Sequence, residues 1–166
     1  MTYQLDIIGD DVRELVRHAG GWIYDRVAAG WRVTVLLPAG DDPRPMRILG
    51  AHTEVVSPTD GFHGRCPQAI ATSARLCRLH PDLVADLGSA MRTREAEIIL
   101  WGEDWPHELD GTPDPATHRL SFAARAFKAQ ALTAAGVGLV PITAAENFRT
   151  ASAVRSWVGA DLVPAG

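Results

Sequence analysis

The stretch WRVTVLL, residues 31–37, is the strongest strand signal in the chain. Most of it is apolar on both faces, because hydrophobic side chains stand at neighbouring as well as at alternate positions. A parallel sheet covered by helices on both faces contains such nearly continuous apolar strands, whereas a strand with one solvated face alternates with polar residues. The stretch therefore predicts a buried strand in an α/β fold.

A long helix is predicted immediately before this strand. Residues 3–8 are a candidate first strand, and apolar residues then recur at helical spacing over residues 12–27. Asp11 and Glu14 stand in the relation of a capping box, and Gly30 lies where a left-handed residue commonly ends a helix. These signals predict a helix of about five turns between two strands.

Helices and strands continue to alternate downstream. The predicted order is short strands at 46–49 and 53–56, a helix at 67–79, a helical stripe at 83–91, a strand at 97–101, a helix at 120–135, an apolar run at 137–140 and a last helix opened by Thr143 and Glu146. Helical crossovers join parallel strands. We therefore expect a single α/β domain over residues 1–166, a three-layer sandwich with a mostly parallel sheet and helices on both faces, Rossmann-like in the broad sense.

The charge balance limits the classes of partner. Sixteen basic and twenty acidic side chains give a formal net charge of −4, which opposes non-specific attraction to nucleic acid or anionic lipid. The first residues lack the basic region and apolar run of a signal peptide, and no stretch approaches the ~20 apolar residues of a membrane span. We therefore expect a soluble, cytoplasmic protein that binds neither membrane nor nucleic acid.

Both cysteines have a histidine three residues away, His63 beside Cys66 and His80 beside Cys77. Two thiolates and two imidazoles suit tetrahedral zinc, and Cys77 and His80 on one helical turn would point the same way. Zinc is therefore a candidate cofactor, although the spacing matches no common zinc module. In the alternative, Cys77 lies on the apolar stripe of its helix and packs as a small hydrophobic side chain.

Acidic and aromatic side chains follow two predicted strands, those at 3–8 and 97–101. In open α/β sheets, ligands collect outside the carboxyl ends of the strands. If the two loops converge, their carboxylates could hold Mg²⁺ or act as acid and base, and their tryptophans could stack on a ring. In the alternative, Asp11 only caps its helix and the acidic loop residues are solvated. The candidate ligand-binding residues are Asp10, Trp101, Glu103, Asp104, Trp105 and His107.

Two further patterns call for a structural explanation. Gly20 and Gly21 lie inside the first predicted helix, where each costs on the order of 1 kcal/mol relative to alanine. Close approach of another backbone, a kink or an early end of the helix would account for them. Lys128 lies with arginines opposite the apolar stripe of the helix at 118–135, which favours a solvated face over a phosphate site. No common nucleotide-binding, serine-hydrolase or metalloprotease motif is present.

The opening segment resembles two known families. The run IIGDD, a helix and then GWRVTVLL are similar to a response-regulator receiver domain, in which an acidic pair ends the first strand. The matching phospho-acceptor aspartate and lysine are absent, and the resemblance covers only the first 37 residues. The same segment is slightly similar to deacetylases that carry a histidine-proline-aspartate-aspartate motif before a glycine pair, but here the strand ends in Gly9 with no histidine. We assign no family.

Two functional hypotheses remain. The first is a non-catalytic or regulatory α/β domain that binds a small ligand or a protein partner and forms a homodimer, with tryptophans at the interface. The second is a small metal-dependent enzyme with an acidic pocket at the carboxyl ends of the strands. In the second, Asp10, Glu103, Asp104 and His107 would be the ligands and acid/base groups. The two hypotheses differ in whether these loops meet.

Overall fold

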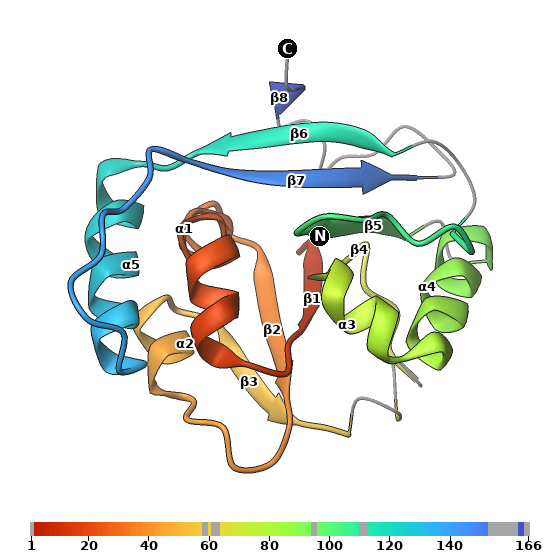
Figure 1. Cartoon of the computed structure of the whole chain (residues 1–166), viewed down its shortest axis with the longest axis horizontal. Helices are drawn as coiled ribbons and strands as arrows, with labels where there is room; N and C mark the ends of the chain where they lie inside the picture. Colours follow the sequence, from red (N-terminus) through yellow and green to blue (C-terminus); the bar gives the residue numbers. More distant parts are fainter. Residues whose placement is uncertain are drawn as a thin grey trace.

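A computed structural model describes residues 2–57, 60, 64–93, 96–109, 113–152 and 163–164 (Figure 1). Helices and strands alternate over most of the chain. The elements are β1 (Gln4–Ile8), α1 (Val12–Ala28), β2 (Arg32–Leu37), α2 (Arg44–Ile48), β3 (His52–Val55), β4 (Ala69–Ser73), α3 (Ala74–Leu79), α4 (Pro81–Thr93), β5 (Glu97–Trp101), β6 (Asp114–Arg119), α5 (Phe122–Ala134), β7 (Ala145–Ala151) and β8 (Val163–Pro164).

One sheet contains all the described strands, in the order β3-β2-β1-β4-β5-β7-β6-β8. The strands from β3 to β5 pair in parallel, whereas β7, β6 and β8 extend the sheet through antiparallel pairs. The α/β class is confirmed, but the prediction of a mostly parallel sheet is wrong because the sheet is mixed. The cause is the direction of β7, which joins β5 antiparallel after the chain has passed through β6 and α5.

Each face of the parallel strands contributes to a separate apolar cluster. Leu5 and Ile7 of β1 pack in the cluster that contains α1 residues, and Ile8 packs in the cluster that contains α3 and α4 residues. This division follows from the alternation of side chains along a strand. Figure 1 shows α1, α2 and α5 on one side of β1, and α3 and α4 on the other.

Local signals located the first helix correctly. The Asp11 carboxylate accepts a hydrogen bond from the backbone N–H of Arg13 and caps α1, and Gly30 follows the helix with φ of 91°. The predicted strand at 31–37 is β2, whose side chains are buried after the first residue. Among the described residues, no helix has the length and apolar character needed to cross a membrane.

Three downstream predictions of secondary structure are wrong. Residues 67–79 form β4 and the short helix α3, residues 46–49 lie mainly in α2, and the segment opened by Glu146 is strand β7. All five side chains of β4 are buried between β1 and β5. A short apolar run fits a buried strand and a buried helix equally well, so the pairing of neighbours decides between them.

A buried ion pair joins β7, α5 and α1. Lys128 Nζ lies 2.6 Å from a carboxylate oxygen of Glu146, and it also donates a hydrogen bond to the backbone carbonyl of Arg17. Glu146 accepts hydrogen bonds from the backbone N–H groups of Gly21 and Trp22 in the middle of α1. The prediction of a solvated Lys128 is therefore wrong. Burial raises the pKa of Glu146, and the ammonium group of Lys128 opposes that rise.

The glycine pair of α1 is explained by close packing. A Cβ atom on Gly21 would lie 2.2 Å from the Leu120 side chain, and one on Gly20 would lie 3.4 Å from Cγ of Lys128. The absence of a Cβ atom at these two positions therefore lets the side chains of Leu120 and Lys128 approach the helix closely. The sequence suggested close approach of another backbone, whereas the atoms that approach the two glycines belong to side chains.

Candidate functional site

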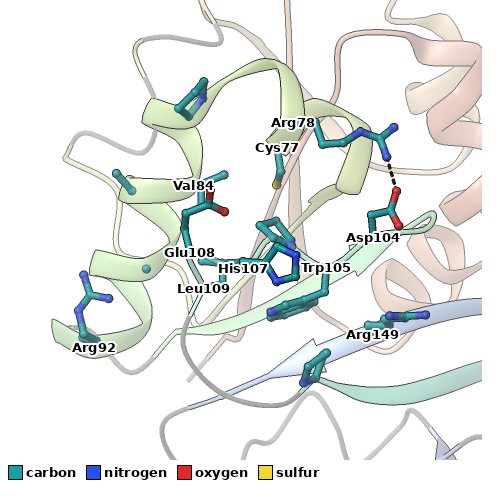
Figure 2. A pocket seen from close by; sticks show the side chains of 15 residues that line it. Cys77, Arg78, Val84, Arg92, Asp104, Trp105, His107, Glu108, Leu109 and Arg149 are labelled. Atoms are coloured by element: carbon teal, nitrogen blue, oxygen red, sulfur yellow. Dashed lines mark hydrogen bonds and ion pairs between the residues drawn. The ribbon is translucent and has the colours of Figure 1, made fainter.

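A pocket of about 920 Å³ lies between α3, α4 and the segment that follows β5 (Figure 2). We call it the β5 pocket. Its position at the carboxyl end of a parallel strand is the usual place for a ligand in an open α/β sheet. The residues that line it are Cys77, Arg78, Pro81, Val84, Ala85, Gly88, Arg92, Asp104, Trp105, Pro106, His107, Glu108, Leu109, Pro113 and Arg149.

The segment after β5 owes its path to two left-handed residues. Gly102 has φ of 89° and Asp104 has φ of 72°. Aspartate is one of the few side chains that tolerate this conformation, and its presence at a pocket is a reason to look for function there. Figure 2 shows Trp105 and His107 inside the pocket, between the α3–α4 wall and β7.

Positive and negative side chains are mixed around the β5 pocket. Arg78 Nη1 lies 2.7 Å from Oδ2 of Asp104 on the pocket wall, and both side chains are mostly exposed. Arg92 of α4 and Arg149 of β7 line other parts of the wall, and Glu108 adds a second carboxylate. Three guanidinium groups against two carboxylates make this pocket locally basic on an acidic protein. Polar or anionic small molecules suit such a lining.

A second group of charged residues lies at the carboxyl end of β1. We call it the strand-end centre, and it consists of Asp10, Glu14, Arg75 and Trp101. Arg75 Nη2 lies 2.7 Å from Oδ1 of Asp10 and 3.0 Å from Oε2 of Glu14. The indole N–H of Trp101 donates to the other oxygen of Glu14 at 3.4 Å. The hydrogen bond to Glu14 and the charge of Asp10 raise the pKa of Arg75.

Helix α3 links the two groups of residues. Arg75 and Arg78 are three residues apart on this helix, so their side chains project from the same face. One contacts the carboxylates that follow β1, and the other contacts Asp104 after β5. The two acidic loops that the sequence singled out therefore each contact an arginine of α3.

The predicted ligand-binding residues divide between these places. Asp104, Trp105 and His107 line the β5 pocket. Asp10 and Trp101 belong to the strand-end centre, where Trp101 is buried. Glu103 is exposed and does not line the pocket.

The predicted zinc ligands are spread over several environments. Cys77 is buried against the β5 pocket, and burial raises the pKa of its thiol to about 12. Cys66 is exposed, and His80 is half-buried directly after α3. His63 lies outside the described residues. No cluster of three or more His, Cys, Asp or Glu side chains that could hold a metal ion occurs in the part of the chain that the structure describes.

The carboxylates that the sequence suggested as magnesium ligands are paired with arginines in the structure. Asp10 and Glu14 both contact Arg75, and Asp104 contacts Arg78. A divalent cation needs several oxygen ligands around it, and a guanidinium group at hydrogen-bond distance competes for the same oxygens. The described residues therefore do not form a site ready to hold Mg²⁺ or zinc.

Sequence reasoning missed the four arginines of these two sites. Arg75 and Arg78 were hidden by the wrong assignment of 67–79 as one helix, and Arg149 by that of β7 as another, while Arg92 lies at the end of the helix α4. A signal existed for two of them. Two arginines three residues apart, directly after a buried strand, would have placed cations at the carboxyl edge of the sheet.

Comparison with known proteins gives a fold and no family. No protein-family model matches the chain, and no curated protein matches it in sequence. Among solved structures, it is similar to the A40926 pseudoaglycone deacetylase Dbv21, with a TM-score of 0.61 and 15% identity over 93% of this chain and 99% of that one. It is also similar to the zinc-inhibited form of the teicoplanin deacetylase Orf2, with a TM-score of 0.56 and 12% identity over 92% and 100% of the two chains.

A third structure with the same fold is GalB, the 4-carboxy-2-hydroxymuconate hydratase from Pseudomonas putida KT2440. Its TM-score is 0.52, with 10% identity over 93% of this chain and 97% of that one. All three are enzymes, so the comparison contradicts the hypothesis of a non-catalytic or regulatory domain. At these sequence identities the likeness establishes the fold alone and does not establish which reaction this chain catalyses.

Proposed function

We propose that this chain is an enzyme that adds water to a small organic substrate bound in the β5 pocket. The observation that carries the proposal is the meeting of Asp104, His107 and Arg78 on the wall of one pocket at the carboxyl edge of the sheet. Deacetylases and a hydratase share the fold, and both kinds of enzyme use water as a reactant. The proposal therefore covers both hydrolysis and hydration, and the substrate screen below distinguishes them.

The lining supplies the groups that such a reaction needs. In hydrolysis of an N-acyl bond, a base takes a proton from water, the water oxygen attacks the acyl carbon, and the carbon–nitrogen bond breaks as the nitrogen takes up a proton. Imidazole and carboxylate groups carry out these proton transfers in proteins. We assign them to His107 and Asp104, with the guanidinium of Arg78 placed to stabilise negative charge on the substrate oxygen.

Substrate binding would use the remaining wall. Trp105 offers a ring face for an aromatic or sugar ring, and Leu109 and Val84 add apolar surface. Arg149 lies on β7 at the other side of the pocket, where a carboxylate of the substrate would be recognised. A small molecule with an apolar ring and an anionic group is the class that this arrangement favours.

The test is a turnover screen with two substrate classes. One panel contains N-acetylated amino sugars and amino acids, with release of primary amine as the readout, and the other contains unsaturated carboxylates, with loss of absorbance as the readout. We expect turnover in one class, reduced about 100-fold or more by His107→Ala and by Asp104→Asn. Circular dichroism establishes that the variants keep the fold.

A matched control separates a site effect from a general histidine effect. His52 is exposed on β3, far from the β5 pocket in the sheet order, so His52→Ala should leave turnover unchanged. Equal turnover by the wild-type protein and the His107→Ala variant would contradict the assignment of the pocket. Absence of turnover in both classes would contradict the proposed reaction.

Zinc binding by this chain stays a prediction from the sequence. One similar structure is a zinc-inhibited deacetylase, which is compatible with zinc as a ligand of the fold. Elemental analysis of untagged protein purified without chelator, beside a Cys66→Ser/Cys77→Ser variant, tests it. One zinc per chain that is lost in the variant would establish the cysteine site. Wild-type protein without bound metal would contradict the prediction of a zinc site.

Two other expectations also belong with the proposal. A homodimer, and a cytoplasmic location, follow from the sequence reasoning only. Sedimentation of the purified chain tests the first, with a mass of twice 17.9 kDa expected. Cell fractionation tests the second.

A further inference from the structure

The positive charge in the strand-end centre is the guanidinium group of Arg75. Two carboxylates meet there, from Asp10 after β1 and from Glu14 in the first turn of α1. Both accept a hydrogen bond from the same nitrogen of Arg75, at 2.7 Å and 3.0 Å. The nearby Asp11 carboxylate is engaged elsewhere, because it caps α1. A single guanidinium group therefore lies where two acidic side chains would otherwise repel each other.

Strand β4 and helix α3 fix the position of this guanidinium group. β4 pairs in parallel with β1, so the two strands end at the same edge of the sheet. Helix α3 starts directly after β4, and the Ser73 side chain caps it by accepting from the N–H of Leu76 at 3.0 Å. Arg75 is the second residue of α3. Its backbone is thus fixed by a strand and a capped helix, and its guanidinium group contacts both carboxylates.

The remaining oxygens of the centre are also partly used. Oε1 of Glu14 accepts from the indole N–H of Trp101, which is buried at the end of β5. A divalent cation in this position would have to displace both the guanidinium and the indole from their carboxylate oxygens. Guanidinium groups remain charged at every working pH and fit carboxylates with several donors, so displacement is unfavourable.

We propose that Arg75 is the built-in cation of the strand-end centre and takes the place of a divalent metal ion between Asp10 and Glu14. The proposal rests on the proposed function for one consequence only, namely that turnover in the adjacent β5 pocket needs no added divalent cation. The assignment itself concerns binding and is tested without a substrate.

The test uses Tb³⁺, which binds to oxygen ligands as Ca²⁺ does and emits light when a nearby indole is excited. Trp101 contacts Glu14 and is therefore close enough to sensitise an ion bound at this centre. We expect the wild-type protein to give no saturable emission from this centre. We expect the Arg75→Ala variant to gain it, because Asp10 and Glu14 are then released, and the double variant Arg75→Ala/Asp10→Asn to lose it again.

Arg78→Ala is the matched control. It removes an arginine from the same helix face, but its partner is Asp104 and not the carboxylates of the centre. It should leave the Tb³⁺ signal as in the wild-type protein. If Arg75→Ala does not fold, Arg75→Gln keeps most of the stem volume, removes the charge and should show the same gain.

Two results would overturn the assignment. One is saturable Tb³⁺ or Zn²⁺ binding by the wild-type protein that Asp10→Asn abolishes. The other is a folded Arg75→Ala or Arg75→Gln variant that gains no binding. Neither result depends on turnover, so failure of this assignment and failure of the proposed function are distinguishable. Turnover that disappears with a chelator and returns with a divalent ion would contradict the metal-independent consequence alone.

Discussion

Ion pairs of similar length lie in different surroundings in two regions of this molecule. In the interior, the side chains of Lys128 and Glu146 lie 2.6 Å apart and are 4% and 2% exposed. At the carboxyl edge of the sheet, those of Arg78 and Asp104 lie 2.7 Å apart and are 54% and 72% exposed. Water screens the second pair but not the first. Removal of one partner of the interior pair would therefore leave a buried charge unpaired, whereas both partners of the edge pair are already in contact with water.

Burial, more than distance, distinguishes these two contacts. The Glu146 carboxylate also accepts two backbone hydrogen bonds from α1, so all its partners are fixed. Asp104 has its backbone in a left-handed conformation beside a pocket, and its side chain reaches solvent. Four experiments sharpen this comparison or break it, and they are ordered by the size of the expected effect.

The largest effect is expected from Glu146→Ala. This change leaves the ammonium of Lys128 buried without its carboxylate and removes the acceptor of the Gly21 and Trp22 N–H groups. Breaking a buried pair in this way costs about 3–5 kcal/mol. Urea unfolding followed by tryptophan fluorescence measures the loss. A loss below about 1 kcal/mol would mean that the buried pair contributes no more to stability than an exposed surface pair does.

The two cysteines allow the same comparison of a buried with an exposed group, here without an ion pair. Cys66 is exposed, whereas Cys77 is buried and its pKa is raised to about 12 by burial, so its thiol stays protonated at neutral pH. Because the thiolate is the reactive form, we expect Cys77 to react with a disulfide reagent at least about 100-fold more slowly than Cys66. The Cys66→Ser variant should lose the fast phase. A fast phase that survives in that variant would mean that Cys77 is open to reagent through the pocket.

A pair of glycine substitutions tests the packing around the buried ion pair. Gly21→Ala would place Cβ 2.2 Å from the buried Leu120 side chain, and overpacking of this kind costs about 1–3 kcal/mol. A Cβ atom at Gly88 in α4 would meet only the guanidinium end of the Arg92 side chain, at 3.1 Å, so Gly88→Ala should stabilise by up to about 1 kcal/mol through helix propensity. Thermal unfolding of both variants provides the comparison. Equal shifts would show that Leu120 has room to move.

The smallest effect on stability is expected from Arg78→Ala. Because the pair with Asp104 is exposed, its loss should change the free energy of unfolding by less than about 1 kcal/mol. The same variant should impair turnover in the β5 pocket, because Arg78 lies beside the proposed acid/base groups. Urea unfolding and the turnover screen give the two readouts. A large loss of stability with normal turnover would mean that the Arg78–Asp104 pair stabilises the fold and takes no part in the reaction.

Part of the candidate site was predictable from the sequence through one topological rule. Strands of a parallel sheet place their following loops at one edge, and this rule selected Asp104, Trp105 and His107, which line the β5 pocket. The rule selects loops and not their partners. Arg75 and Arg78 were missed because they became neighbours of those loops only when α3 was placed after β4.

The errors in secondary structure have a related cause. Thr143 and Glu146 match the spacing of a capping box, which predicts a helix. In the fold, Glu146 instead lies on β7 and points at Lys128 and at the backbone of α1. An acidic residue read as a helix cap was in fact the partner of a buried lysine, and no local pattern distinguishes the two.

The sequence by itself determined α1, with its Asp11 cap and its end before Gly30, and the buried strand β2. These features depend on residues a few positions apart. The tertiary structure alone decided the antiparallel extension of the sheet, the burial of Lys128 and the contact of Arg75 with Asp10. The physical reason is separation along the chain: Asp10 and Arg75 are 65 residues apart, and Gly21 and Glu146 are 125 apart. Burial and partner choice at such distances are set by how the elements pack.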